Sequence, residues 1–238
     1  MAQGTVESGK EWTFSVSTDL AGDSENSDLN YWASGDVDVP SSIEKKEGKL
    51  ILSNGLVERV FDIGKNFQTI SYKNLYTGLE LLNTEDLQAD ASITLNKEYA
   101  DNSTQGDQLF YIGGENQDVS SFQFVDYEIE EKTEEPFHWE WDERISPESM
   151  KDTQWPAAGK ALVVNYKAPK GIDKDFADVK VQVRYEIYDG IPSISKSVHV
   201  TNEGKNDVIV DKMEVEILPV PVTLKDASVC RGNHELRQ

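Results

Sequence analysis

The sequence has few of the side chains that most metal sites and covalent catalytic mechanisms need. It contains a single cysteine, Cys230, and three histidines in 238 residues. One cysteine excludes an intrachain disulfide, and it also excludes a zinc site built from several thiolates. His138, His199 and His234 lie far apart in the sequence, and no HEXXH pattern is present. We therefore expect no metal site.

Glycine-rich nucleotide-binding motifs and the serine nucleophile elbow are also missing. Gly113-Gly114 follows a short apolar segment, but no helical pattern follows it, so the pair does not predict a phosphate-binding loop. No apolar run reaches the ~18 residues that a membrane helix needs. The sequence therefore predicts no cofactor and no membrane partner.

Positive charge is scarce. The chain has 23 Lys and Arg against 44 Asp and Glu, which gives a formal net charge of -21. Nucleic acids and anionic membrane surfaces are bound by basic surfaces, so we expect neither as a partner. Uncharged ligands such as sugars, and cations, are compatible with this balance. Solubility alone also explains an acidic surface.

Alternation of apolar and polar residues is the pattern that the sequence has in abundance. The stretch Val179–Thr201 alternates on both sides of Asp189-Gly190 and Pro192, which predicts two long half-buried strands joined by a turn. Asn54-Gly55 predicts another tight turn, between KLILSN and LVERVFDI. Roughly a dozen such segments, with turn signals every eight to twelve residues, predict an all-β fold, a large antiparallel two-sheet sandwich.

The other alternating segments predict the remaining strands and the domain organisation. Residues 1–40 are polar and acidic, with one strand expected at Glu11–Thr18, and we assign them to an N-terminal strand and loop segment of the same domain. Residues 41–238 form the sandwich. Asn96–Gly114 is expected to be mostly loop. Further strands are expected at Phe67–Tyr72, Leu79–Leu82, Ala91–Leu95, Ser121–Glu130, Ala161–Tyr166, Asp207–Leu218 and Val222–Val229.

Aromatic residues gather between Lys132 and Lys160, a segment that holds three of the five tryptophans. Trp139 and Trp141 share a face if this segment is a strand, and Trp155 lies in the polar sequence QWPAAGK. Aromatic rings stack on the apolar faces of sugars, so these three residues are candidate carbohydrate contacts. Packing in the core is the competing interpretation, above all for Trp139 and Trp141.

Asp189 is the most prominent carboxylate because it lies at the turn of the long hairpin. Glycoside hydrolysis needs two carboxylates that face each other across a sugar pocket, and the sequence offers many acidic residues but no defined pair. Asp189 is therefore a candidate for sugar contact rather than for catalysis. The competing interpretation is that Asp-Gly serves turn formation alone.

Several segments together resemble a known domain. SNGLVERVFDI and TISYKNLYTGLELL resemble the opening hairpins of the N-terminal β-supersandwich of α-galactosidase-like bacterial glycoside hydrolases, which has the galactose-mutarotase-like fold. WPAAGKALVVNY and VRYEIYDGIPSISKSVHVTNEG resemble its WP-x-x-G loop and its YE-x-YDG-x-P-x-x-SK hairpin. The similar segments run from about Lys49 to Leu218. Ser193 and Ser197 depart from the pattern, where bulkier residues are expected around the lysine, and residues 1–40 have no counterpart in it.

The resemblance implies a non-catalytic accessory domain of a carbohydrate-active enzyme. In that family the domain packs on a catalytic domain and helps to shape its pocket, while the catalytic carboxylates lie in a barrel that would follow Gln238. Contact with sugar would then involve Asp189 and the tryptophans, and the interface with the catalytic domain would involve Tyr188 and Lys196. The family also implies a periplasmic or extracellular protein, whose signal peptide is absent from this chain.

Two alternatives stay open from the sequence. A stand-alone mutarotase-like epimerase would need a histidine acid and a carboxylate base in one cleft, with His138 or His199 as the acid. A purely structural interaction domain would need no ligand site.

Overall fold

The computed structural model describes residues 4–6, 8–19, 39–97, 107–114, 120–133 and 157–221. Within these ranges all regular secondary structure is β-strand, and every pair of neighbouring strands is antiparallel. The prediction of an antiparallel all-β fold is therefore confirmed. A search of the same ranges finds no helix with the length and apolar character to cross a membrane.

The strands form three sheets rather than the two that the sequence predicted. The long sheet has the order β10 (Gln123–Glu130), β11 (Gly159–Lys167), β12 (Val179–Tyr188), β13 (Ser193–Asn202) and β2 (Glu11–Asp19). The β8 sheet has the order β1 (Gly4–Val6), β14 (Val208–Glu214), β8 (Ala91–Asn96) and β9 (Gln108–Ile112). The β5 sheet follows chain order: β3 (Ser42–Lys46), β4 (Lys49–Ser53), β5 (Val57–Asp62), β6 (Gln68–Asn74) and β7 (Leu79–Glu80). A third sheet forms because β3 to β7 pair among themselves and separately from β1, β14, β8 and β9.

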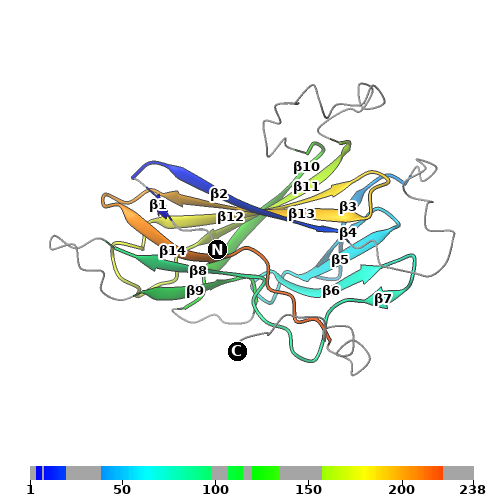
Figure 1. The fold of residues 1–238 in the computed structure, drawn as a ribbon, viewed down its shortest axis with the longest axis horizontal. Coiled ribbons are helices and arrows are strands. Elements are labelled where there is room, and N and C mark those ends of the chain that lie inside the picture. Colours follow the sequence, from blue (N-terminus) through cyan, green and yellow to red (C-terminus); the bar gives the residue numbers. More distant parts are fainter. Residues whose placement is uncertain are drawn as a thin grey trace, which may run out of the picture.

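The long sheet extends over both shorter sheets, as in a sandwich (Figure 1). Strands β8, β9 and β14 lie towards one end of the molecule, and β4 to β7 lie towards the other. A single apolar cluster takes side chains from all three sheets. Within it the rings of Phe61 on β5 and Tyr185 on β12 lie 4.8 Å apart, in a tilted arrangement that aromatic pairs prefer. Burial between layers is therefore what joins the sheets.

The hairpin of β12 and β13 confirms the predicted alternation on one strand and departs from it on the other. On β13 every second residue is buried, including Ile194, Lys196 and Val198. On β12 both faces are buried from Val183 to Tyr188. The second face of β12 is buried by polar contacts. Arg184, on the face turned away from the core, donates hydrogen bonds to Glu186 and Glu130.

Most predicted strands are found within one or two residues of their expected ends. The strands β1 and β3 were not predicted, because β1 has only three residues and β3, with the sequence SIEKK, has Ile43 as its one apolar side chain. Strand β9 forms inside the segment expected to be mostly loop, where it pairs with β8. Strand β2 pairs with β13 and so joins residues 11–19 to the long sheet. The expected strand Val222–Val229 lies outside the described residues.

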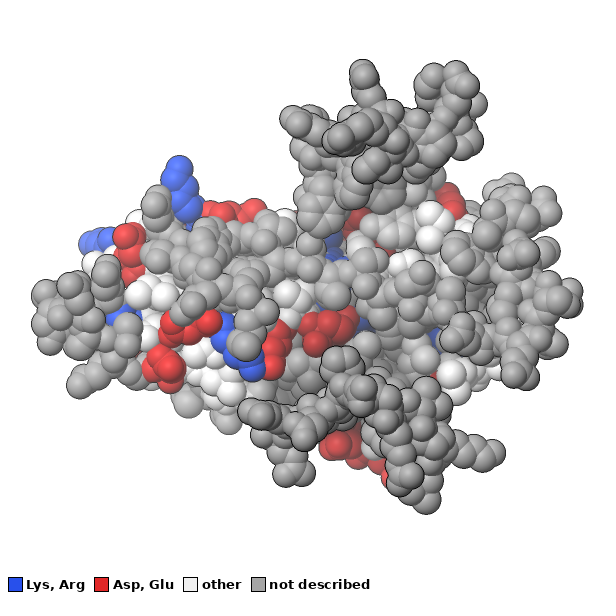
Figure 2. Space-filling model, in the orientation of Figure 1, with Lys and Arg blue, Asp and Glu red and all other residues white. Residues whose placement is uncertain are grey.

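Charge on the visible face is mixed rather than separated into fields of one sign. Among the described residues in Figure 2, red acidic side chains stand beside blue basic ones and white neutral ones. Ion pairs on the surface include Lys180 with Glu203 and Lys212 with Glu214. Exposed pairs of this kind contribute little to stability.

Substitution of Gly159 should expose how closely β11 and β12 approach each other. A Cβ atom at this position would lie 2.2 Å from the backbone oxygen of Ile187 and 2.9 Å from the Cα atom of Tyr188. We expect Gly159→Ala to lower the free energy of unfolding by about 1–3 kcal/mol, because the backbone must move. Urea denaturation measures this change. Gly64→Ala is the matched control, since its Cβ would meet only Asp62 Oδ1 at 3.4 Å. A loss no larger than that of the control would show that the strands separate easily here.

Candidate functional site

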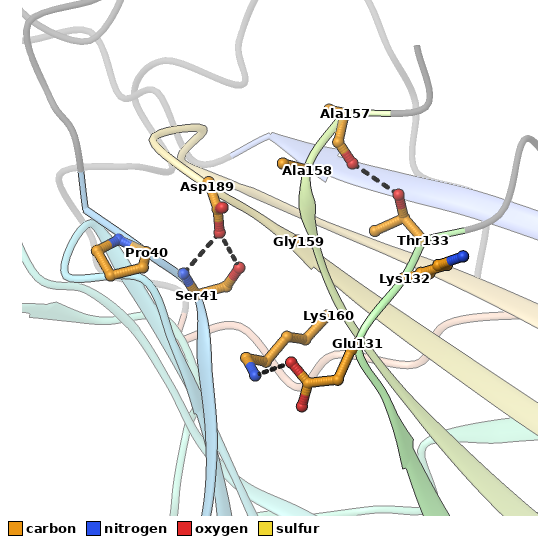
Figure 3. Close-up of a pocket in the computed structure, with 10 residues that line it drawn as sticks. All are labelled: Pro40, Ser41, Glu131, Lys132, Thr133, Ala157, Ala158, Gly159, Lys160 and Asp189. Atoms are coloured by element: carbon orange, nitrogen blue, oxygen red, sulfur yellow. Dashed lines mark hydrogen bonds and ion pairs between the residues drawn. The ribbon is translucent and has the colours of Figure 1, made fainter. Parts of the chain in front are cut away.

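A cleft of about 350 Å³ opens where β12 turns into β13 (Figure 3). Four segments far apart in the sequence form its walls: the approach to β3, the end of β10, the start of β11 and the turn after β12. Asp189, which the sequence predicted as a sugar contact, is one of the lining residues. The full lining consists of Pro40, Ser41, Glu131, Lys132, Thr133, Ala157, Ala158, Gly159, Lys160 and Asp189.

The carboxylate of Asp189 is held by one of its two oxygens. Ser41 donates both its backbone N–H, at 2.7 Å, and its hydroxyl to Asp189 Oδ1. Figure 3 shows these two contacts converging on the same oxygen. The other oxygen, Oδ2, accepts no hydrogen bond from the described residues. Because Ser41 is buried while Asp189 is exposed, the pair fixes the carboxylate from behind and leaves Oδ2 as an acceptor towards solvent.

The turn that carries Asp189 is held by Asn54, from a different hairpin in a different sheet. Asn54 Nδ2 donates to the backbone oxygens of Tyr188 and Ile191, both at 2.7 Å. Its Oδ1 accepts from the backbone N–H groups of Leu56 and Val57, each at 3.1 Å. The side chain is 1% exposed, so these four bonds satisfy a buried amide. Asn54 therefore fixes its own turn and the Asp189 turn together.

On the opposite wall of the cleft, the ends of β10 and β11 are tied together. Lys160 forms an ion pair with Glu131. The hydroxyl of Thr133 donates to the backbone oxygen of Ala157 at 2.6 Å. Thr133 and Ala157 flank residues 134–156 in the sequence. The three candidate tryptophans, Trp139, Trp141 and Trp155, lie outside the described residues, so their contact with sugar stays a prediction.

Tyr188 and Lys196, predicted at the interface with a further domain, make contacts within this chain. The Tyr188 hydroxyl donates to Glu186 at 3.0 Å and lies 2.7 Å from Ser195 Oγ. Burial raises the pKa of this hydroxyl well above its ordinary value. Lys196 is 1% exposed, and its ammonium points into the core. Their role at an interface stays a prediction.

Lys196 belongs to a buried group of four charged side chains, Arg59, Asp90, Lys196 and Glu216, which we call the ionic cluster. Arg59 donates to both oxygens of Glu216, at 2.7 and 3.0 Å. Lys196 Nζ donates to the backbone oxygen of Asp90 at 2.8 Å and to Glu216 at 3.2 Å. Thr69 donates its hydroxyl to Asp90 at 2.6 Å.

The ionic cluster lies where all three sheets meet. Arg59 is on β5, Lys196 is on β13, and Asp90 and Glu216 flank the β8 sheet at β8 and β14. Sequence reasoning did not find it. The signal was nonetheless present: Arg59 shares the apolar parity of Val57 and Phe61 on β5, a position where an unpaired cation is costly to bury.

Burial and mutual attraction act in opposite directions on the pKa values of the ionic cluster. Burial raises the pKa of Asp90 and lowers that of Lys196. Burial would also raise the pKa of Glu216, but Arg59 and Lys196 together outweigh it, so this pKa lies below its usual range. Two cations and two carboxylates leave the formal charge balanced. A closed, neutral cluster of this kind is suited to holding the sheets together rather than to proton transfer.

Neither a metal centre nor a histidine-based site is evident among the described residues. No group of three or more His, Cys, Asp or Glu side chains is placed there to hold a metal ion. His199 Nδ1 lies 3.1 Å from Glu11 and its Nε2 lies 3.1 Å from Ser197 Oγ. His199 does not line the Asp189 cleft. His138 and His234 lie outside the described residues.

Comparison with known proteins gives no relative: no family model, no curated protein and no solved structure matches this chain.

Replacing Glu216 tests the ionic cluster. At neutral pH we expect Glu216→Gln to lower the free energy of unfolding by about 3–5 kcal/mol, because Arg59 and Lys196 lose their shared carboxylate. The folded-state pKa of Glu216 is depressed, so its stabilisation is complete above the ordinary value of 4.5 and is lost as pH falls through the folded-state pKa. The gap between wild type and variant should therefore narrow below pH 4.5.

Urea denaturation measures both effects when it is carried out at pH 7 and at successively lower pH values, down to the acid range where carboxylates titrate. Glu203→Gln is the matched control, since Glu203 pairs with Lys180 at the surface and its loss should change stability by less than about 1 kcal/mol. If the two variants lower the free energy of unfolding equally at pH 7, the ionic cluster does not stabilise the fold more than an exposed ion pair does.

Proposed function

We propose that this chain is a non-catalytic accessory domain of a carbohydrate-active enzyme, in which a galactose-mutarotase-like supersandwich packs on a catalytic domain outside this chain. The Asp189 cleft is the place where the domain contacts sugar. The enzyme is a bacterial glycoside hydrolase that works in the periplasm or outside the cell. The all-β sandwich with its antiparallel sheets is compatible with this fold type.

The observation that carries the proposal is the meeting of three sequence motifs at one cleft. Asn54, from SNGLVERVFDI, holds the turn of YEIYDGIP through two hydrogen bonds. Ala158, from WPAAGK, accepts a hydrogen bond from the backbone N–H of Asp189 at 2.8 Å. The segments that resemble the supersandwich domain in sequence are therefore in contact in space, and their contacts shape one concave site.

The chemistry of the cleft suits an uncharged sugar. Asp189 Oδ2 is an acceptor for a hydroxyl group, and Pro40, Ala157 and Ala158 offer apolar surface for the face of a ring. A volume of about 350 Å³ is within the range of small-molecule sites. The acidic net charge of -21 disfavours anionic ligands.

Asp189→Asn is the sharpest test of sugar contact. An asparagine can keep its oxygen towards Ser41 and place its NH₂ group where Oδ2 now lies, so the turn is preserved while an acceptor becomes a donor. We expect galactose- and glucose-containing oligosaccharides to bind at least about tenfold more weakly, since a hydrogen bond to a charged group contributes ~1.5–3 kcal/mol. Isothermal titration calorimetry measures the affinity.

Glu203→Gln is the control for the loss of a carboxylate, because it removes a surface carboxylate that is paired with Lys180 and lies outside the cleft. It should leave the affinity within about twofold of wild type. Unchanged binding in Asp189→Asn, with the same unfolding temperature as wild type, would contradict the role of Asp189. The absence of any oligosaccharide binding by the wild type would contradict the sugar-contact function.

The epimerase alternative has a separate readout. Because His199 is outside the cleft, we expect the chain to leave the rate of α-galactose mutarotation unchanged, as followed by NMR. If the chain enhances this rate and the enhancement disappears in His199→Ala, the chain is an epimerase and the accessory function is wrong.

A further inference from the structure

A row of polar side chains crosses the outer face of the long sheet at one level. Asp126 on β10 is the register partner of Asn165 on β11, Asn165 is that of Gln182 on β12, and Gln182 is that of His199 on β13. Alternate residues on these strands, such as Val164, Val183 and Val198, are buried in the core. The four polar residues therefore face away from it, and we call them the amide row.

Hydrogen bonds along the amide row fix the orientation of its side chains. Asn165 donates its amide to Asp126 at 2.7 Å, and Gln182 donates its amide to Asn165 Oδ1 at 3.0 Å. His199 lies 3.1 Å from Glu11, which stands at the β2 end of the row. With each amide oriented, Gln182 Oε1 and the second amide hydrogen of Asn165 have no partner among the described residues.

The spacing of the amide row is that of the strands. Neighbouring strands lie ~4.8 Å apart, so the row from β10 to β13 is about 14 Å long. Sugar units of an extended, equatorially linked chain repeat at a distance close to the strand spacing. Successive units lying across the strands would thus each face one member of the row. Donors and acceptors that are already oriented lose little entropy when they bind such a ligand.

The charges around the amide row select among ligands. Asp126 and Glu11 place carboxylates at its two ends. On β12 the nearest cations are paired, Lys180 with Glu203 and Arg184 with Glu130 and Glu186, whereas Lys167 on β11 is an exposed cation beside the row. An anionic chain would be repelled at both ends, and the -21 net charge adds to this repulsion. Hydroxyl groups are both donors and acceptors, and they match the mixed amide and carboxylate groups of the row.

We propose that the amide row is a second carbohydrate-binding surface, which takes an extended uncharged oligosaccharide lying across β10 to β13. The inference rests on the proposed carbohydrate function and adds a site that is separate from the Asp189 cleft. The cleft would hold one end unit or a branch, whereas the row would hold a length of chain.

The test measures binding of uncharged β-1,4-linked oligosaccharides of two to six sugar units by isothermal titration calorimetry. We expect affinity to rise with length until about four units, when the row is filled. The double variant Asn165→Ala with Gln182→Ala should weaken binding of the longer oligosaccharides at least about tenfold and remove the dependence on length. Lys180→Ala, on the same strand and face but outside the row, should leave both unchanged. An oligogalacturonate of equal length should bind more weakly than its uncharged counterpart.

The outcomes separate the two carbohydrate sites. If Asp189→Asn abolishes all oligosaccharide binding and the double variant leaves binding unchanged, the amide row is not a binding site, but the proposed function stands. If no oligosaccharide binds to the wild type, both proposals are wrong. If the double variant instead abolishes self-association seen by light scattering, the face is an interface between copies of this chain and the inference is overturned. Loss of length-dependent binding in the double variant, with an unchanged unfolding temperature, supports the amide row.

Discussion

The fold depends on burying two cations and two carboxylates at one point without leaving any of them unpaired. Arg59 comes from the β5 sheet, Lys196 from the long sheet, and Asp90 and Glu216 from segments next to the β8 sheet. Apolar packing alone would let the layers slide, because it is not directional. The hydrogen bonds of the ionic cluster are directional, and they join side chains from all three sheets. We infer that the cluster fixes how the three sheets sit together, while the apolar core supplies most of the stabilisation.

The functional geometry follows from that arrangement. Once the long sheet and the β5 sheet are fixed relative to each other, the turn after β12 lies beside the turn between β4 and β5, and Asn54 bonds across the gap. Ser41, at the entry to β3, then reaches Asp189. The outer face of the long sheet is set by the same constraint, since the inner face is taken up by the core. The positions of the cleft and of the amide row therefore both follow from how the three sheets pack together.

The sequence allowed most of the strands and the two main turns to be predicted, because each depends on neighbours within a few residues. The division into three sheets was not predictable in this way, since it depends on which strands pair over long distances. Asp90 escaped notice because it lies just outside β8, where no alternation marks it as buried, and Glu216 because it takes a polar position in the expected strand Asp207–Leu218. The partner of Asp189 was also hidden: Ser41 is 148 residues away in the sequence. Arg59 and Lys196 were the visible clues, because each is a cation at an apolar parity of its strand.

The double role of Asn54 makes two turns in different sheets depend on a single side-chain amide. Its NH₂ group faces two backbone oxygens, and its oxygen faces two backbone N–H groups. Hydrolysis of the amide to a carboxylate would place a negative charge against the carbonyl oxygens of Tyr188 and Ile191, with no change in side-chain size. Such damage would leave the β4–β5 turn intact and release the other one. This hydrolysis would therefore alter the geometry of the cleft while the rest of the fold is retained.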